Sequence, residues 1–537
     1  MPPRTPRVLV LSLLAALLAI ASLTAPARAT DPDPLAPAAD DATAAAKETL
    51  AEVQDLFDGL ESLGVGAEAD LTLALRDLAL LKDDLPDPLQ PAAERLLARP
   101  TDGGSDQFGD GYGTPEATPV CSEVVCIHYV TSTGDRVAEV DNNDNDVPDY
   151  VDLALRTMTD VHASYVAAGY RPPKSDIDAP NNGGNPLTDI YLADIGNDGL
   201  YGYCATDGDI PVNGPQDTWG YCVLDNDYAR DEFPTNTPKE NLQVTAAHEY
   251  FHAVQFGYDF SEDDWVMEAT ATWAEDELYD GVDDNVQYLR SGPMSLPHKS
   301  LDQFFQSFHY GAWIFFRYLT ELFPSSHGGM PVLVRQLWRR LDDASGGRGE
   351  YSLEGVKGVL RKRNLSLTQA FAGFAAANRT PGRSYAEGKA NRYPRAPLAR
   401  AATLSQAAPR TGPLRLILDH LAAETVRYTP ANSLVSPKWR LRLRLDMAAR
   451  WKGTGAVVRI QPRSGAPRTM WVTLDKFGNA SPKYNFTTTK VKYVEVTLVN
   501  ASDDFRCNRG TRFSCGGRPK FDNSAQWISA RAFKVKS

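Results

Sequence analysis

The sequence lacks an excess of positive charge. It holds 55 Lys and Arg residues against 69 Asp and Glu residues, which gives a formal net charge of −14, and its pI is near 5.2. Domains that bind nucleic acid usually present a basic surface to the phosphates. We therefore expect no nucleic-acid partner.

Several motifs that mark other enzyme classes are also missing. There is no Gly-x-Ser-x-Gly motif, no glycine-rich phosphate loop and no Cys-x-x-Cys pair. The first absence gives serine-hydrolase chemistry no support, and the second gives none to a nucleotide-binding loop. The third disfavours a zinc site built from cysteines. No internal repeat is visible.

Long apolar runs are absent except near the start. Residues 8–23 are apolar, follow Arg4 and Arg7, and precede the small-residue sequence Ala27-Arg28-Ala29. This order predicts a secretory signal peptide over residues 1–29, with an uncleaved N-terminal anchor as the alternative. No other segment is long enough to cross a bilayer. We therefore expect a secreted, extracellular protein whose mature form has no membrane span.

The six cysteines fall into three local pairs. An even number of cysteines in an exported chain predicts disulfide bonds, and local pairing is the simplest of fifteen connectivities. None of the cysteines lies beside a clear base, as a catalytic nucleophile would. The predicted pairs are Cys121 with Cys126, Cys204 with Cys222, and Cys507 with Cys515.

The order of helical and strand-like patterns predicts an α+β protein. Residues 30–100 carry leucines at helical spacing and predict a helical N-terminal region, either a propeptide or a permanent cap. Residues 101–118 are rich in glycine and predict a linker. Residues 119–400 mix helices and strands and are predicted to form the central domain. Residues 401–537, with strict alternation at 439–445, predict a C-terminal all-β sandwich.

Individual elements can be assigned from periodicity. In the first part of the chain, strands are predicted at 124–131 and 188–193, and helices at 152–169, 242–256, 266–278, 310–322, 331–341 and 365–378. In the last part, strands are predicted at 439–445, 456–460, 469–474, 490–499 and 525–535.

A His-Glu-x-x-His motif occupies residues 248–252. An α-helix turns about 100° per residue, so His248 and His252 project from one face and can share one zinc ion. Glu249 lies beside them, within reach of a zinc-bound water. Asn241 is the predicted cap of this helix. Two unrelated histidines on a surface helix are the alternative, but an apolar stripe predicts that the helix is packed.

The third ligand separates the classes of zinc peptidase. The three-histidine class needs a glycine and a histidine where this chain has Gln255 and Tyr258, so that class is excluded. Glu268, sixteen residues after His252, is the preferred ligand. Three protein ligands leave a coordination position open for water, as in catalytic zinc sites.

Other carboxylates near Glu268 are weaker candidates. Glu262, Asp263 and Asp264 belong to a polar stretch that predicts a solvated loop. Glu275 returns to the helix face of Glu268 seven residues later and could hydrogen-bond a ligand histidine. A plain solvated glutamate is the alternative there.

The two motifs together resemble the gluzincin metallopeptidases. These combine His-Glu-x-x-His with a glutamate ligand in a Trp-x-x-Glu-[Gly/Ala]-x-Ala helix, matched here by residues 248–252 and 265–271. More narrowly, the chain is similar to a family of secreted bacterial metalloproteases with a Pro-Asp-Tyr motif upstream, matched at 148–150, and the Asp-Asn-Asp-Tyr sequence at 225–228 fits the same family. The likeness covers roughly residues 119–320. Where these enzymes usually have glycine after the ligand, this chain has Ala269.

The resemblance implies a zincin-like catalytic domain and a zinc metalloendopeptidase that acts on a protein or peptide substrate. His248, His252 and Glu268 would be the zinc ligands. Glu249 would be the catalytic base that assists attack of the zinc-bound water. Tyr310, near the start of a helix, resembles the tyrosine that donates to the oxyanion in related enzymes. Trp313 replaces the usual small residue three positions later, and His309 is the alternative donor.

An acidic segment predicts a second metal. Residues 141–152 resemble a calcium loop, with Asp146 where such loops usually have glycine. An acidic turn that caps the next helix is the alternative. The predicted ligands are the side chains of Asp141, Asn143, Asn145, Asp149 and Asp152 and the carbonyl of Val147.

Two other functions compete with peptide hydrolysis by the zinc site. The first is a non-catalytic, metal-stabilised binding or adhesion protein whose sandwich uses Trp439, Trp451 or Trp471. The second keeps the zinc hydrolase but changes its substrate to a glycoprotein or a cell-wall peptide. A purely structural zinc would want a fourth protein ligand, which favours the enzyme.

Overall fold

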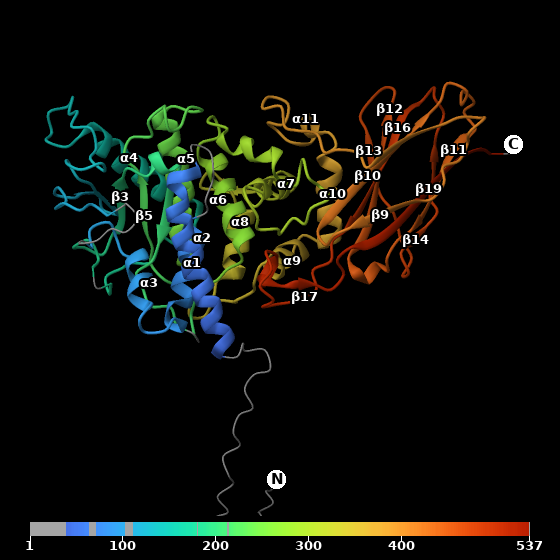
Figure 1. The fold of residues 1–537 in the computed structure, drawn as a ribbon. Coiled ribbons are helices and arrows are strands. Elements are labelled where there is room, and N and C mark those ends of the chain that lie inside the picture. Colours follow the sequence, from blue (N-terminus) through green and yellow to red (C-terminus); the bar gives the residue numbers. More distant parts are fainter. Residues whose placement is uncertain (1–38, 64–70, 103–110, 180, 212–213, 536–537) are drawn as a thin grey trace, which may run out of the picture.

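A computed structural model describes residues 39–63, 71–102, 111–179, 181–211 and 214–535. The predicted signal peptide and much of the predicted linker lie outside the described residues. The fold mixes helices with several sheets, which agrees with the α+β class. Figure 1 shows the first sheet and a two-sheet sandwich at opposite ends of the molecule, with α6 to α10 between them.

The N-terminal part of the described chain is helical, as predicted. Leu71, Leu75 and Leu78 are buried, and they join one hydrophobic core with the first sheet and its helices. The helix α2 packs on the strand β4, and α1 packs on α2. The elements are α1 Ala39–Leu63, α2 Leu71–Leu81, the 3₁₀ turn η1 Lys82–Asp84 and α3 Gln90–Leu96.

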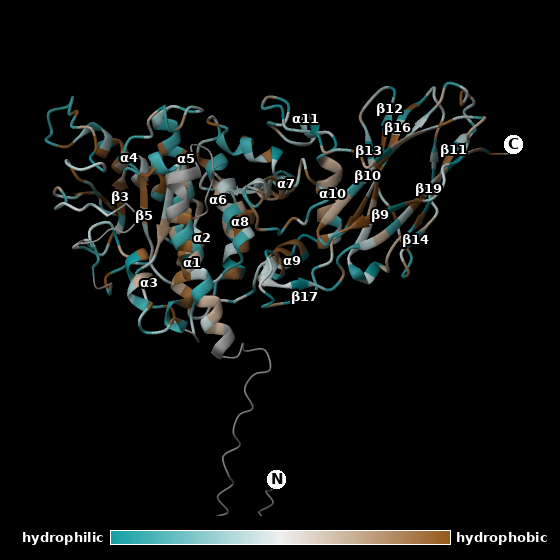
Figure 2. Ribbon diagram, in the orientation of Figure 1, coloured by the Kyte–Doolittle hydropathy of each residue, from teal (hydrophilic) through white to brown (hydrophobic). Residues whose placement is uncertain are grey.

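The first sheet has five strands in the order β1-β2-β3-β5-β4. The strands β2, β3 and β5 are parallel, and antiparallel β1 and β4 form the two edges. Hydrophobic residues run along β3 and β5 (Figure 2), as expected for strands covered on their faces. The bounds are β1 Val120–Cys121, β2 Val125–His128, β3 Thr188–Ala193, β4 Gly202–Ala205 and β5 Tyr221–Asp225, and the short 3₁₀ turn η2 spans Gly196–Asp198.

Three long helices carry the predicted site. The helix α4 (Asp149–Ala168) packs on β2, α5 (Pro238–Phe256) packs on β4 and β5, and α6 (Asp264–Leu278) packs on α5. The predicted cap of α5 at Asn241 is wrong. Thr237 accepts from the Glu240 amide and Glu240 accepts from the Thr237 amide, which forms a capping box one turn earlier. Asn241 is a buried residue inside the helix.

Shorter helices connect this region to the sandwich. The predicted helix at 310–322 begins as a 3₁₀ turn and continues as α7, and α9 was not predicted. The elements are η3 Asp284–Arg290, η4 Tyr310–Ala312, α7 Trp313–Leu322, the hairpin β6 Ser326–His327 with β7 Met330–Pro331, α8 Val332–Leu341, α9 Leu353–Arg361, α10 Leu367–Ala377 and α11 Pro381–Ser384.

The C-terminal part consists of two facing sheets with a separate hydrophobic core. One sheet has the order β13-β12-β16-β10-β8, and the other β14-β11-β19-β9 with β15 paired to β11. Their bounds are β8 Arg400–Leu404, β9 Leu414–Leu418, β10 Ala422–Pro430, β11 Trp439–Asp446, β12 Thr454–Pro462, β13 Arg468–Trp471, β14 Asn479–Ala480, β15 Lys483–Asn485, β16 Val491–Asn500 and β19 Ser524–Lys534; a small β17–β18 hairpin (Phe505–Arg506 with Arg518–Pro519) and the 3₁₀ turns η5 Arg450–Lys452 and η6 Ser514–Gly516 complete this part.

The three predicted disulfide bonds are confirmed. Cys121–Cys126 joins β1 to β2, Cys204–Cys222 joins β4 to β5, and Cys507–Cys515 closes a loop near the sandwich. Among the described helices, none has both the length and the apolar composition needed to span a bilayer.

Candidate metal centre

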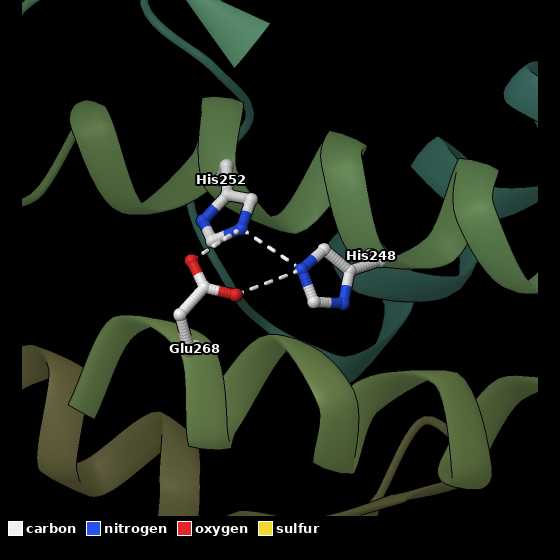
Figure 3. A group of neighbouring side chains, drawn as sticks. All are labelled: His248, His252 and Glu268. Atoms are coloured by element: carbon white, nitrogen blue, oxygen red, sulfur yellow. Dashed lines mark hydrogen bonds and ion pairs between the residues drawn. The ribbon is translucent and has the colours of Figure 1, made fainter. Parts of the chain in front are cut away.

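Two helices bring three buried side chains to one point. His248 and His252 project from α5, and Glu268 projects from the facing helix α6 (Figure 3). The Nε2 atoms of the two histidines lie 3.0 Å apart. Each Nε2 also lies 3.1 Å from a Glu268 carboxylate oxygen. The chain therefore forms a buried group of two imidazoles and one carboxylate that could hold a metal ion.

The protonation of His252 can be assigned from Gln255. The Gln255 amide nitrogen donates to the Met267 carbonyl and to the Thr270 hydroxyl, so the amide oxygen faces His252. That oxygen lies 2.7 Å from His252 Nδ1, which must therefore carry the proton. The Nε2 atom of His252 is left with a lone pair that points at the common centre, as a metal ligand requires.

His248 is oriented in a similar way by Glu275. The Nδ1 atom of His248 donates to Glu275 Oε1 at 2.5 Å, so its Nε2 faces His252 and Glu268. Lone pairs of two imidazoles and a carboxylate repel one another at these distances unless a proton or a cation lies among them. The donor set of two nitrogens and one oxygen suits zinc. The residues present thus fit a bound metal.

The charges around this centre favour a cation. Burial opposes a charge on His248, yet its hydrogen bonds to Glu268 and Glu275 raise its pKa well above the ordinary value. Burial likewise opposes a charge on Glu268, yet His252 and His248 hold its pKa well below the ordinary value. Burial raises the pKa of Glu275 to about 8, and the hydrogen bond to His248 opposes this shift. Glu268 is therefore the carboxylate that provides negative potential at the common point.

Glu249 lies next to the edge strand β4. It is 6% exposed. A Cβ atom on Gly202 would lie only 2.9 Å from Glu249 Cγ and 2.8 Å from Thr245 Cγ2. A glycine at this position in β4 therefore allows α5 to approach the strand closely, and this approach fixes where Glu249 lies.

The N-terminal helix α2 reaches the same carboxylate. The Thr72 hydroxyl donates to Glu249 Oε2 at 3.2 Å and accepts from the Cys204 amide of β4 at 3.0 Å. One turn along α2, the buried Arg76 donates to the Glu262 carbonyl at 2.8 Å and to Asp264 at 2.5 Å. The helix is thus bound both to the edge strand and to the start of α6.

A small cavity lies beside the centre. Its volume is about 70 Å³, and it is lined by residues of the β4 region, α5, α6 and the 284–310 segment, including His248, Glu249, Glu275, Asp284 and Tyr310. The Tyr310 ring lies 5.9 Å from the His248 ring between centroids. His309 is buried and stacks on Phe304. Of the two predicted oxyanion donors, Tyr310 is therefore the one that lines the cavity.

The prediction of a solvated loop at residues 262–264 is wrong for its first two residues. Glu262 is 0% exposed and Asp263 is 5% exposed. Glu262 accepts from the Ser352 amide, and Asp263 accepts from the Ser514 hydroxyl. The polar stretch is buried because loops distant in the sequence fold over it, which local composition cannot reveal.

The predicted calcium loop has the backbone shape that its sequence suggests. Asp146 adopts a positive φ of 64° at the position where such loops have glycine. Asp141 accepts from the Asn145 and Asp146 amides, and Asp152 accepts from the Asn143 and Asn145 side-chain amides. These bonds also suit an acidic turn before α4. Calcium binding stays a prediction.

Comparisons with known proteins do not identify a family. No family model and no curated protein sequence matches the chain. One solved structure that matches is CorA, a surface-associated copper-binding protein from Methylomicrobium album BG8, at 7% identity over 26% of this chain and all of that one, with a TM-score of 0.15. Another is a 4-O-methyl-α-glucuronidase specific for decorated arabinogalactans, at 10% identity over 69% of this chain and 54% of that one, with a TM-score of 0.14. TM-scores this low assign neither a fold nor a function.

Sequence reasoning missed three residues that shape the centre. Gln255 lies three positions after His252, a spacing that places both on one helix face and could have revealed it. Gly202 and Thr72 belong to segments far from the motif in sequence. No local signal connects them to Glu249, because their proximity depends on the pairing of β4 and the docking of α2.

Proposed function

We propose that this chain is an exported zinc metallopeptidase of the gluzincin type. The observation that carries the proposal is the convergence of His248, His252 and Glu268 on one buried point, with the histidine Nδ1 atoms held by Glu275 and Gln255. A zinc ion held there would supply Lewis acidity, which lowers the pKa of water and polarises a carbonyl group.

Glu249 is the proposed base. It immediately follows His248 on α5, and its carboxylate lines the same cavity as His248. In peptide hydrolysis it takes a proton from the attacking water and delivers that proton to the leaving amine. Its low exposure keeps bulk water from competing for the proton.

Tyr310 is the proposed oxyanion donor. Its side chain lines the cavity across from α5 and stacks on Tyr288, with 5.1 Å between ring centroids. A phenolic hydroxyl in this place could donate to the oxygen on which negative charge develops. Unchanged turnover in Tyr310→Phe would rule out this role.

The proposal is tested by metal analysis and by cleavage of an unfolded protein substrate. We expect about one zinc per chain in the wild type and in Glu249→Gln, but cleavage by Glu249→Gln about 10²- to 10⁴-fold slower because the proton carrier is lost. Glu354→Gln, an exposed glutamate on α9, is the matched control. A wild type without stoichiometric metal, or a Glu249→Gln variant that cleaves equally well, would refute the proposal.

The sandwich supports a second, binding function less strongly. Trp439 is buried in the sandwich core, whereas Trp451 and Trp471 are 71% and 47% exposed. Exposed tryptophans could contact a polysaccharide or a cell surface. This function would add to the metal centre, because the two exposed rings lie on the sandwich and not at the cavity.

A further inference from the structure

A row of cations lies where α10 and α11 meet the sandwich. In the sheet, Glu495 of β16 pairs with Arg427 of β10 on one side and with Arg459 of β12 on the other. We call the following residues the junction cluster: Arg379, Arg383, Arg395, Arg427, Arg459, Lys492 and Glu495. The cluster thus holds six cations and one carboxylate, in a chain whose net charge is −14.

Glu495 does not neutralise this charge. Its Oε1 atom accepts from Arg379 at 2.9 Å and from Arg427 at 2.6 Å, and it lies 3.6 Å from Arg395. Three guanidinium groups therefore share one oxygen. Two members of the cluster are deeply buried, since Arg379 is 3% and Arg459 is 7% exposed. Buried cations in excess over anions are costly unless a further anion joins them.

A cavity opens onto the cluster. Its volume is about 360 Å³, and Arg379, Arg383, Arg395 and Lys492 line it. The Nε atom of Arg379 is buried and has no hydrogen-bond acceptor. Burial, with the charges of Arg395 and Arg427, lowers the pKa of Arg379. Burial likewise lowers the pKa of Arg459. The cavity is lined by four cations and by no acidic residue, which suits it to an anion.

We infer that this cavity binds an oxyanion group, phosphate or sulfate, either as the free ion or as an ester on a larger molecule. The guanidinium fork matches the oxygen geometry of such groups and can form paired, charge-assisted hydrogen bonds with them. The volume falls within the range of about 300–1,000 Å³ for small-molecule sites, so an ester-bearing sugar unit would fit. The inference is independent of the metal centre.

Calorimetry on the full chain tests this site with inorganic phosphate and inorganic sulfate at constant ionic strength. We expect saturable binding, and we expect the double variant Arg383→Gln/Arg395→Gln to weaken it about tenfold or more because two charged donors are lost. Both residues are exposed, so their replacement should leave the fold intact. Arg444→Gln, an exposed arginine on β11, is the control.

A sulfated polysaccharide distinguishes the two sources of the group. Binding tighter than that of inorganic sulfate, and lost in the same double variant, would support the ester, whereas equal or weaker binding would support the free ion. The inference is overturned if neither ion binds the wild type, or if the double variant binds both ions as well as the wild type does.

A second inference concerns α2 and rests on the proposed peptidase function. The Thr72 hydroxyl donates to one oxygen of Glu249. The same hydroxyl accepts from the Cys204 amide of the edge strand β4. An edge strand with unpaired amides is where an extended peptide can add to a sheet.

The geometry points to α2 as an intramolecular inhibitor that covers the base and the edge strand. The buried Arg76 anchors it through a partly buried ion pair with Asp264 and through the carbonyl of Glu262, just before the helix that bears Glu268. Cleavage requires α2 to move away from Glu249 and β4, and this movement breaks the contacts of Thr72 and Arg76. The N-terminal region is then a regulator of the metal centre.

Two variants of the full chain test the inhibitor. Thr72→Val removes both hydroxyl bonds at nearly constant volume, and Arg76→Gln removes the buried charge. We expect each to increase the rate of zinc removal by dipicolinic acid and the rate of peptide cleavage, about tenfold for Arg76→Gln, because loss of the guanidinium contacts to Asp264 and to the Glu262 carbonyl shifts the docking equilibrium. Arg95→Gln on α3 is the exposed control.

The two readouts separate the two hypotheses. Failure of every variant to cleave would refute the peptidase, while zinc removal would still report whether α2 covers the centre. Equal rates of zinc removal in the wild type and both variants would overturn the inference that α2 covers the centre. If the variants lose zinc faster but cleave peptide at the same rate as an active wild type, the inference that α2 inhibits the enzyme is overturned.

Discussion

At the scale of single residues, the centre is defined by the atoms that hold its ligands. Gln255 fixes the tautomer of His252 because its own amide is fixed by Met267 and Thr270. Glu275 fixes the tautomer of His248, because its carboxyl oxygen accepts from His248 Nδ1. An amide oxygen accepts from one histidine and a carboxyl oxygen accepts from the other, and both Nε2 atoms face the same point.

Gln255→Met should weaken zinc binding about 10- to 100-fold, because His252 loses the acceptor that orients it. Competition with a fluorescent zinc chelator measures the affinity. Gln255→Glu retains an acceptor oxygen and should retain most of the affinity. If the methionine variant binds zinc as tightly as the wild type, Gln255 does not position the ligand.

At the scale of elements, the site depends on the contact between α5 and β4. Gly202→Ala would place a Cβ atom 2.9 Å from Glu249 Cγ and would push helix and strand apart. We expect a loss of about 1–3 kcal/mol in the free energy of unfolding and a marked fall in peptide cleavage, with zinc content retained.

Urea unfolding and cleavage assays measure these two effects of Gly202→Ala. Gly281→Ala is the control, since a Cβ atom there meets open space. Unimpaired cleavage by Gly202→Ala would show that the close approach does not set the position of Glu249.

The start of α5 offers a further test at this scale. Thr237→Ala removes the capping box and should lower the free energy of unfolding by about 1 kcal/mol, whereas Thr237→Ser should cost much less. Thermal unfolding at neutral pH compares the two. A similar midpoint for the alanine variant and the wild type would show that the cap is redundant.

Periodicity and motif spacing were enough to find α5 and α6 and to place His248 and His252 on one helix face. They were also enough for β11, β12, β16 and β19. Alternation marks one buried face in β11 and β19, whereas most residues of β16 and the middle of β12 are buried. The short strands β4 and β5 were not predicted. Few residues and burial on several sides give such strands no alternation, and their roles follow from pairing between distant segments.

At the scale of the whole molecule, a buried histidine connects the sandwich to the rest of the chain. His420, which follows β9, contacts Asp302 at 2.9 Å and Asp522 at 3.2 Å, and Ser300 at 3.3 Å. Asp302 also accepts from the Ser514 amide, and the Ser514 hydroxyl reaches Asp263 at the start of α6. One polar network therefore extends from the sandwich to the helix of Glu268.

This network predicts a loss of stability at alkaline pH. Burial alone would lower the pKa of His420, but Asp302 and Asp522 raise it to about 9. The unfolded value is about 6.5, so the charged histidine contributes its full stabilisation below about pH 6.5 and loses it as the pH rises through about 9. We expect the free energy of unfolding to fall by roughly 2–3 kcal/mol across this window.

Urea unfolding at several pH values measures this loss. His420→Asn should remove most of the pH dependence in the window, whereas His298→Asn, at an exposed histidine, should not. An unchanged pH profile in His420→Asn would show that another group is responsible.

The disulfide between Cys204 and Cys222 has a practical consequence for anyone who produces this protein. Both sulfur atoms lie against the backbone carbonyl of Glu249, with Cys204 Sγ at 2.9 Å and Cys222 Sγ at 3.6 Å. The covalent link between β4 and β5 therefore contacts the backbone of Glu249, the proposed base. In a reducing cytosol this link would not persist. We expect material expressed there to bind metal poorly and material expressed in an oxidising compartment to bind it fully, a difference visible in the metal content alone.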